Sequence, residues 1–247
     1  MEMPESAKDL QEKYYEAHAA AYDQVHNASG NHEHNLALRY IDMISTAFGF
    51  QTLLDVGAGT GRGVRFLHER GKLVRGIEPV AAMIAEAEAN GIPRGLIIQG
   101  DGYQLPFENA EFDVAFECGV LHHVAKPHRI VEEMIRVTRR AIFLSDSNRF
   151  GQGRYAARLL KLALYKTGLW PAARFVQTKG KMYTFSEGDG LAYSYSVFDS
   201  YDQLAAETQQ IWLLPTAGEE CRRSWVHPLL TSTHVLLCAF KDTPGKE

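Results

Sequence analysis

Three glycines at alternate positions, Gly57, Gly59 and Gly61, follow an apolar run and precede a helical pattern. Glycine reaches positive φ and has no Cβ, so a ligand can approach the backbone closely at such a turn. The N–H groups at the start of the following helix can bind a carboxylate or a phosphate. The dinucleotide fingerprint Gly-x-Gly-x-x-Gly would require glycine at Arg62. The turn therefore predicts a site for a small polar or anionic cofactor.

Acidic residues stand at the ends of the next two predicted strands. Glu78 ends the pattern 72–78, lies 17 positions after Gly61, and could accept hydrogen bonds from both hydroxyls of a ribose. Asp101 ends the pattern 95–101, and a fourth predicted strand, 112–117, runs into Cys-Gly-Val-Leu-His-His-Val. The combination is far more specific for a nucleoside-binding α/β fold than the glycine turn alone.

With these segments the chain resembles the class I S-adenosylmethionine (SAM) dependent methyltransferases, in particular the small-molecule, type 11-like branch. The resemblance is close over roughly residues 10 to 146. It implies SAM as the cofactor and S-adenosylhomocysteine (SAH) as the product. The cofactor-binding residues that it implies are Tyr14, Asp55, Gly57, Gly59, Gly61, Glu78, Pro79, Met83, Asp101, Gly102 and Glu117.

The same resemblance assigns parts of SAM to these residues. The glycine turn would cradle the methionine part, Glu78 would hold the ribose, and Asp101 would accept from the adenine amino group. Pro79 and Met83 would pack near the adenine, and Tyr14 would meet the SAM carboxylate as a lid residue. The segment 117–120 would line the floor under the sulfonium.

His122 and His123 directly follow the fourth predicted strand and would lie near the transferred methyl group. An imidazole titrates near neutral pH and can take a proton from an acceptor hydroxyl. We favour His123 slightly over His122 as the base, with Asp146 as a further candidate. The alternative is that the histidine pair caps its loop or packs beneath the cofactor without acid–base work. An amine acceptor would need only to be unprotonated.

The order of elements predicts one α/β domain over residues 1–247, with a doubly wound, seven-stranded, mostly parallel sheet. Two amphipathic helices within residues 1–50 are expected to form a lid over the cofactor. The segments 210–214 and 234–240 are expected to add antiparallel strands at the sheet edge. A helical and aromatic insertion, 147–197, is expected to cap the acceptor, because ligands bind outside the carboxyl ends of the strands.

Charge is distributed unevenly along the chain, whose net charge is −4. Residues 147–186 contain no acid and carry +8, so the remainder carries −12. Arg154, Arg158 and Lys161 share one face of a predicted helix over 154–166, and Tyr155 and Leu159 share another. Three interpretations stay open: a solvated helix face, a pocket rim for an anionic acceptor, or a surface that meets anionic membrane.

Several features limit the class of protein. The N-terminus lacks the basic start and apolar stretch of a signal peptide, and no apolar run is long enough to span a bilayer, so a cytoplasmic protein is expected. Cys118, Cys221 and Cys238 have no metal-ligand or disulfide spacing. Two histidine clusters could be considered as metal ligands: His122, His123 and His128, and His26, His32 and His34. Neither includes the carboxylate or thiolate partners that usually complete a site, and no metal is expected.

The sequence thus predicts a SAM-dependent methyltransferase that acts on a small molecule, most simply at oxygen. Carbon or nitrogen transfer to a small or lipid-linked anionic acceptor is the alternative, as is a SAM-binding regulatory protein without turnover; a nicotinamide dehydrogenase fits least. Nucleic acid is not expected as substrate, because Glu-Cys-Gly-Val stands where base-modifying relatives carry Asn/Asp-Pro-Pro-aromatic. Membrane contact is not expected either, and the oligomeric state stays open.

Overall fold

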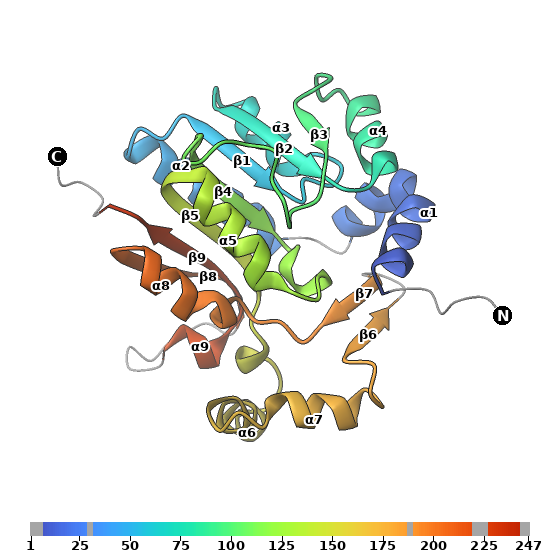
Figure 1. Cartoon of the computed structure of the whole chain (residues 1–247), viewed down its shortest axis with the longest axis vertical. Coiled ribbons are helices and arrows are strands. Elements are labelled where there is room, and N and C mark those ends of the chain that lie inside the picture. The colour runs from blue at the N-terminus through green and yellow to red at the C-terminus, as the bar shows by residue number, and fades with distance from the viewer. Residues whose placement is uncertain (1–6, 29–31, 187–189, 219–226, 243–247) are drawn as a thin grey trace.

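A computed structural model describes residues 7–28, 32–186, 190–218 and 227–242. One sheet with strand order β3-β2-β1-β4-β5-β9-β8 runs through the molecule (Figure 1). Neighbouring strands from β3 to β5 pair in parallel, while β9 pairs antiparallel with both β5 and β8. The strands are β1 (Thr52–Val56), β2 (Leu73–Glu78), β3 (Ile97–Gln99), β4 (Phe112–Cys118), β5 (Thr138–Ser147), β8 (Gln210–Gly218) and β9 (Ser232–Phe240). The doubly wound, seven-stranded, mostly parallel sheet that the sequence predicts is confirmed.

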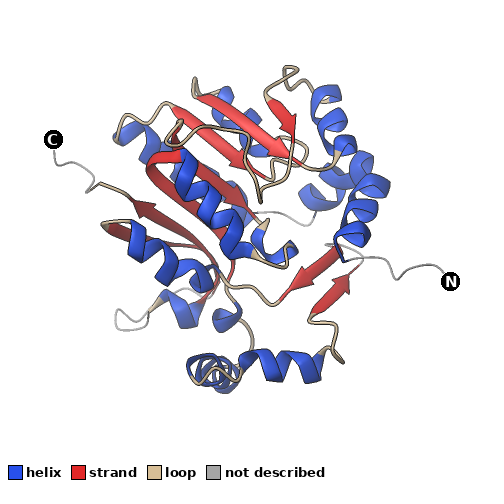
Figure 2. Ribbon diagram, viewed as in Figure 1, coloured by secondary structure: helices blue, strands red, loops and turns tan. Residues whose placement is uncertain are grey.

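Helices cover both faces of this sheet, as Figure 2 shows. Alternate strand residues point to opposite faces, so each strand contributes to two apolar cores. One core contains residues of α2 (His32–Ala47), α3 (Arg62–His68) and α4 (Ala81–Ala89), and the other contains residues of α5 (Pro127–Val137) and α8 (Tyr201–Glu207). Strands buried on both faces need continuous apolar runs, which explains why their positions are readable from the sequence.

The two N-terminal helices differ in their surroundings. The α2 helix buries Leu38, Ile41 and Ile44 in the same core as the sheet. The α1 helix (Ala7–Ala28) instead packs through Ala19 and Tyr15 against Val80 and Met83, beside the start of α4. Only α1 therefore lies where a lid over the carboxyl ends of the strands would be.

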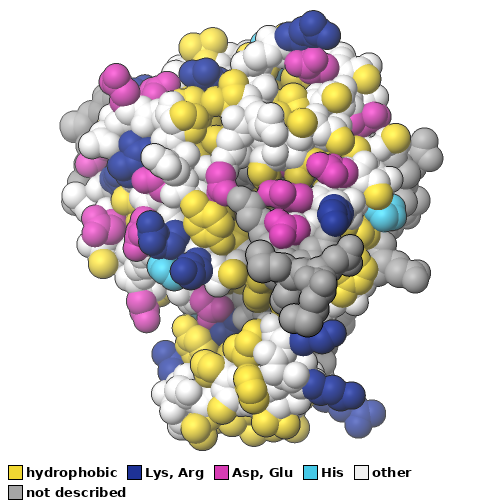
Figure 3. Space-filling model, turned by 45° about the vertical axis from the view of Figure 1, so that its right-hand side comes forward, with side chains coloured by type: hydrophobic (Ala, Val, Ile, Leu, Met, Phe, Trp, Pro, Cys, Tyr) yellow, Lys and Arg dark blue, Asp and Glu magenta, His cyan; other side chains and the backbone are white. Residues whose placement is uncertain are grey.

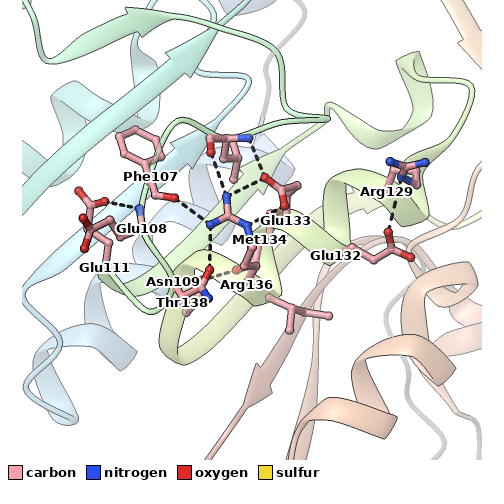
Figure 4. A network of polar contacts seen from close by, with 12 residues as sticks. Phe107, Glu108, Asn109, Glu111, Arg129, Glu132, Glu133, Met134, Arg136 and Thr138 are labelled. Carbon is pink, nitrogen blue, oxygen red and sulfur yellow. Dashed lines mark hydrogen bonds and ion pairs between the residues drawn. The ribbon is translucent and has the colours of Figure 1, made fainter.

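Arg136 of α5 fastens the long loop between β3 and β4 (Figure 4). Its guanidinium donates to the carbonyl oxygens of Phe107 and Leu105, at 2.8 and 2.9 Å, and to the Asn109 side chain at 3.0 Å. Glu133 holds the guanidinium at 2.7 Å and accepts from the Leu105 N–H at 2.8 Å. This network fixes the loop that begins just after Asp101.

The insertion after β5 places two helices at the lower end of the view in Figure 1 and a hairpin between these helices and α1. It contains α6 (Tyr155–Lys166), α7 (Trp170–Gln177) and an antiparallel hairpin of β6 (Tyr183–Ser186) and β7 (Gly190–Tyr193). The hairpin is absent from the sequence prediction, as is the short helix α9 (Pro228–Thr231) before β9. Single turns of 3-10 helix, η1 (Leu121–His123), η2 (Arg149–Gly151) and η3 (Val197–Ser200), complete the described elements.

Two further findings concern predictions about environment. Within the described ranges, every helix is too short or too polar to cross a bilayer. Cys118 and Cys238 form no disulfide among the described residues, and Cys221 lies outside them.

Candidate functional site

A cavity of about 360 Å³ opens at the carboxyl ends of β1, β2 and β4. This volume falls within the range of small-molecule and cofactor sites, about 300 to 1,000 Å³. The α1 helix and the β7 strand close it on other sides. The side chains and backbone that line it include Gln11, Glu12, Tyr15, Tyr22, Gly57, Gly59, Glu78, Pro79, Met83, Asp101, Gly102, Tyr103, Gly119, Val120, His123 and Tyr193.

The glycine turn forms one wall of the cavity. Gly57, Gly59 and Gly61 all have positive φ, at 77°, 55° and 80°. A Cβ at Gly57 would lie 2.5 Å from the Val120 side chain, and one at Gly61 would lie 2.8 Å from Ile92. Gly57 and Gly59 line the cavity, whereas Gly61 packs against the core behind the turn. The turn therefore needs glycine for its backbone conformation and for close packing.

Glu78 lines the cavity and also braces the turn. Its carboxylate accepts from the Gly59 N–H at 2.9 Å and from the Val80 N–H at 3.0 Å. Burial raises the pKa of Glu78 to about 7, although both backbone N–H groups act to lower it. A nearly buried carboxylate at this place is suited to accept hydrogen bonds from a polar ligand.

Asp55 lies behind the turn and does not line the cavity. It is 3% exposed, and its Oδ2 would be only 2.3 Å from a Cβ at Gly63, in the first turn of α3. Burial raises the pKa of Asp55 to about 7, while the charge of Arg62 lowers it and that of Glu78 raises it further. Asp55 is thus placed to support the turn and not to touch a ligand directly.

The adenine side that the sequence predicts is assembled in one place. Pro79, Met83, Asp101 and Gly102 all line the cavity. Asp101 Oδ1 accepts from the Tyr103 N–H at 2.9 Å, which closes the turn after β3. Tyr103, itself a lining residue, accepts from the Lys126 N–H at 3.3 Å through its hydroxyl.

His123 lines the cavity with a defined tautomer. Its Nδ1 lies 2.6 Å from the carbonyl oxygen of Leu191 in β7, and a carbonyl can only accept. Nδ1 therefore carries the proton, and Nε2 of the neutral ring carries the lone pair. The Gln11 amide nitrogen lies 3.2 Å from Nδ1 and cannot donate to a protonated nitrogen. The same Gln11 accepts from the Leu191 N–H at 2.6 Å through Oε1.

His122 has a different partner and does not line the cavity. Its Nδ1 lies 2.8 Å from Asp146 Oδ1, and its backbone N–H donates to Oδ2 at 3.2 Å. Burial acts to raise the pKa of Asp146, but His122, through its charge and its hydrogen bond, the Ser147 N–H and the His34 charge together outweigh burial, and the pKa is lowered. His122 and Asp146 thus form a dyad next to His123, with the two imidazole centroids 3.9 Å apart.

Glu117 lies at the end of β4, beneath the cavity floor. It is fully buried, and its Oε2 accepts from the Val120 N–H at 2.9 Å, while its Oε1 has no hydrogen-bond partner among the residues that the structure describes. Burial and the Asp146 charge raise the pKa of Glu117 well above its ordinary value. It does not line the cavity, although the next residues, Cys118, Gly119 and Val120, do.

Tyr14 lies outside the cavity, against the hairpin. Its ring stacks on His18 with centroids 4.4 Å apart and meets Phe185 of β6 edge-on. Its neighbours on α1, Gln11, Tyr15 and Tyr22, line the cavity instead. Their spacing of four and seven residues puts them on one helix face, a signal that the sequence contains. No sequence pattern indicates that Tyr193 lines the cavity, because the sequence does not predict the hairpin to which it belongs.

One group of potential metal ligands occurs among the described residues. Donor atoms of Glu33, His34 and His234 all lie within 4.8 Å of one another. His34 Nδ1 also lies 3.2 Å from the Ser145 hydroxyl, and burial lowers the pKa of His34 to about 3. The described members of the histidine clusters considered from the sequence are not brought together in this way.

A methyltransferase domain family model matches residues 54–143. An uncharacterized methyltransferase of Mycolicibacterium gilvum is 30% identical over 155 residues, which is 59% of this chain and 61% of that relative. One of Mycobacterium avium is 29% identical over 154 residues, with 58% and 61% covered. The chain spans about three fifths of the length of these curated relatives.

Solved structures share the fold at low identity. A SAM-dependent methyltransferase of Thermotoga maritima, described as a possible histamine N-methyltransferase, matches with a TM-score of 0.55, 16% identity, and 93% and 99% of the two chains covered. The magnesium protoporphyrin IX methyltransferase of Synechocystis, solved with bound SAH, matches with a TM-score of 0.53 and 16% identity, and the match covers 85% of this chain and 84% of that chain.

The sheet order, the glycine turn and the cavity at the strand ends define a Rossmann-like fold, in which ligands bind outside the carboxyl ends of the strands. Residues 54–143 are similar to the methyltransferase domain family, and the whole chain shares the Rossmann-like fold of the SAM-dependent methyltransferases among these solved structures.

Proposed function

We propose that this protein transfers a methyl group from SAM to a hydroxyl group of a small-molecule acceptor, with His123 as the general base. The observation that carries the proposal is the position of His123 in the cavity wall, with Nδ1 bonded to the Leu191 carbonyl. The cofactor is the one that the domain family implies. The acceptor and its reacting atom are inferred from the site chemistry.

The residues in the cavity fit the proposed cofactor. Gly57 and Gly59 expose the backbone of the turn to the cavity, where a polar chain can meet it, and Glu78 offers a buried carboxylate to ribose hydroxyls. Asp101, Met83 and Tyr103 provide an acceptor and apolar surfaces for the adenine. Bound SAM would supply a methyl group that its sulfonium charge has already activated.

Positioning is the larger part of the catalytic task. Holding two reactants in line can contribute roughly 7 to 11 kcal/mol through effective molarity. The cavity walls from α1 and β7 come from distant parts of the chain and are joined by Gln11, which bonds the Leu191 N–H. This contact fixes the β7 wall that His123 contacts, so the acceptor side of the cavity has a defined shape.

His123 is suited to take a proton from the acceptor hydroxyl at Nε2. The bond from Nδ1–H to the Leu191 carbonyl would persist after protonation and would stabilise the resulting positive charge. A positioned base contributes about 10² to 10⁴ in rate. Because an unprotonated amine needs no base for methyl transfer, an oriented imidazole favours an oxygen acceptor over a nitrogen acceptor.

Calorimetric titration with SAH tests the cofactor assignment without knowledge of the acceptor. Wild type should bind SAH with micromolar affinity, and Glu78→Ala should weaken binding about 100-fold or more, because hydrogen bonds to a charged group are worth about 1.5 to 3 kcal/mol each. Glu132→Ala, at an exposed acid on α5, should bind as wild type does. Absence of SAH binding by folded wild type would overturn the proposal.

Radiolabelled SAM then tests the acceptor class. A set of phenols, carboxylates and aliphatic alcohols would be incubated with the enzyme beside the matching amines. Methyl transfer confined to hydroxyl compounds would support the oxygen assignment, whereas turnover of amines alone would contradict it.

A further inference from the structure

Two basic side chains of the α6 helix, Arg158 and Lys161, point into the protein. Arg158 is 5% exposed and donates to the carbonyl oxygens of Gly153 at 2.6 Å and Leu230 at 2.8 Å. Lys161 donates to the carbonyls of Arg149 and Gln152, at 2.6 and 2.8 Å. These charges anchor the helix to the body of the domain and do not form the outer surface that a basic amphipathic helix suggests.

A partly buried ion pair strengthens the same attachment. Both terminal nitrogens of Arg149 contact the Asp199 carboxylate, and one also donates to the Ser194 carbonyl at 2.7 Å. The guanidinium lies over the rings of Tyr165 and Trp170, at 5.1 and 5.3 Å from their centroids. The insertion is therefore held firmly, and its outer face is a defined surface.

That outer face is apolar. Seven of the eleven large apolar side chains found exposed among the described residues lie between positions 155 and 182. Figure 3 shows the resulting concentration of hydrophobic side chains on the lower part of the molecule. We call this set the lobe surface; it consists of Tyr155, Leu159, Leu160, Leu169, Phe175, Val176 and Met182. Patches of this kind mark sites of contact with a protein or a membrane.

Basic side chains accompany the lobe surface. Arg154, Lys166, Lys179 and Lys181 are exposed at the ends of α6 and α7, and the sequence has no acid from 147 to 186. A second copy docked through the same face would bring like charges together. Apolar side chains with cationic neighbours instead match the interface of an anionic bilayer, where acyl chains and phosphate groups meet.

From this arrangement we propose that the lobe surface docks the protein onto membranes that contain anionic phospholipids. The apolar side chains enter the boundary between headgroups and acyl chains, and the four exposed basic residues lie against lipid phosphates. The proposal stands apart from methyl transfer, because no side chain of the lobe surface lines the cavity.

Co-sedimentation of the full chain with sucrose-loaded vesicles tests the proposal. Wild type should sediment with vesicles of equal parts phosphatidylcholine and phosphatidylglycerol, and should stay in solution with phosphatidylcholine alone. The double variant Leu160→Ser, Val176→Ser should bind the anionic vesicles at least about tenfold more weakly, because it removes two apolar anchors. The matched control Met43→Ser, Leu73→Ser, which changes two exposed apolar residues elsewhere, should sediment as wild type does.

A charge variant tests the electrostatic part. Lys166→Gln, Lys179→Gln, Lys181→Gln should weaken binding by about fivefold per residue, and added salt should weaken wild-type binding in the same direction. Unchanged SAH affinity and melting temperature would show that each variant is folded.

Two results would overturn the proposal. One is a wild type that does not sediment with anionic vesicles. The other is a concentration-dependent dimer in analytical ultracentrifugation that Leu160→Ser, Val176→Ser abolishes, with vesicle binding unaffected by that variant; the lobe surface would then join two copies of the chain.

Discussion

His122 and His123 are adjacent in the chain but have separate tasks in the structure. His122 faces the buried Asp146 carboxylate, whereas His123 faces the cavity and bonds the Leu191 carbonyl. An oriented imidazole in a cavity is suited to proton transfer, and an imidazole bound to a buried carboxylate is suited to stabilise the charge beside it. The two residues should therefore respond differently to substitution.

The variant His123→Ala should lower kcat by about 10² to 10⁴, because it removes the proposed base. SAH affinity should be unchanged, since His123 is not among the residues that we assign to the cofactor. The measurement is steady-state kinetics with the acceptor that the radiolabel screen identifies, together with SAH calorimetry. Equal turnover of variant and wild type would show that positioning alone drives the reaction.

His122→Ala is the matched comparison. It leaves the fully buried Asp146 without its imidazole partner, so the main effect should be on thermal stability. The tautomer of His123 offers a check that needs no acceptor: nitrogen NMR should find the proton on Nδ1 at neutral pH. A proton on Nε2 would contradict the assignment of Nε2 as the base.

Position along the sequence explains which site residues could be predicted. Glu78, Asp101 and the glycine turn stand at the ends of apolar strands, and local pattern alone places such residues at one edge of a parallel sheet. Tyr14 was predicted from the resemblance, yet Gln11, Tyr15 and Tyr22 of the same helix line the cavity. Which face of α1 turns inward depends on Val80, Met83 and the hairpin, all far away in sequence.

The helices and strands that the sequence predicts are those whose conformation depends mainly on nearby residues. The strands β1 and β4, and most of β5 and β9, carry the apolar runs that burial on both faces requires. The β6–β7 hairpin is short, its two strands pair only with each other among the described residues, and it takes its place from contacts with Gln11 and Tyr14 of α1. The inward face of α6 is equally non-local, because carbonyl groups of Gly153, Arg149 and Leu230 receive its charges.

At the scale of elements, the hydrogen bonds of Arg136 hold the loop after β3 in place. Arg136→Ala would leave the Phe107 and Leu105 carbonyls and Glu133 without their shared donor, and should lower the free energy of unfolding by about 2 to 4 kcal/mol. SAH binding should also weaken, since the loop begins beside Asp101. Chemical denaturation and calorimetry measure the two effects.

Arg129→Ala supplies the control on the same helix. Arg129 pairs with Glu132 at 3.6 Å, and both side chains are more than half exposed. An exposed pair of this kind contributes about 0 to 1 kcal/mol, so the variant should be nearly as stable as wild type. Equal losses in the two variants would mean that the Arg136 network does not hold the loop.

At the scale of the whole molecule, buried ionisable groups, among them Asp55 and Glu78 at the glycine turn, make the stability of the fold depend on pH. Asp55 and Glu78 both have pKa values raised to about 7 by burial, and His34 has a pKa lowered to about 3 by the same cause. Each shift means that the folded and unfolded chains bind different numbers of protons between these pH values. The three groups do not act in the same direction.

For Asp55 the folded state keeps a proton that the unfolded state has released, from about pH 4 to about pH 7. Its contribution to stability therefore falls as pH rises through this window and levels off above it. For His34 the unfolded state binds the extra proton between about pH 3 and the ordinary value of 6.5, so its contribution rises with pH there. Substitution of either residue should remove one of these opposing slopes.

The free energy of unfolding of Asp55→Asn, taken relative to that of wild type, should therefore be higher at pH 8 than at pH 5. The difference should be up to about 3 kcal/mol, at ~1.4 kcal/mol per pKa unit. For His34→Gln the free energy of unfolding relative to wild type should instead be higher at pH 5 than at pH 8. Denaturant titrations of the three proteins at both pH values measure the differences directly. If the relative stability of both variants changed in the same direction with pH, burial of these groups would not control the pH dependence of stability. The turn that carries Asp55 would then be more hydrated than its packing against Gly63 implies.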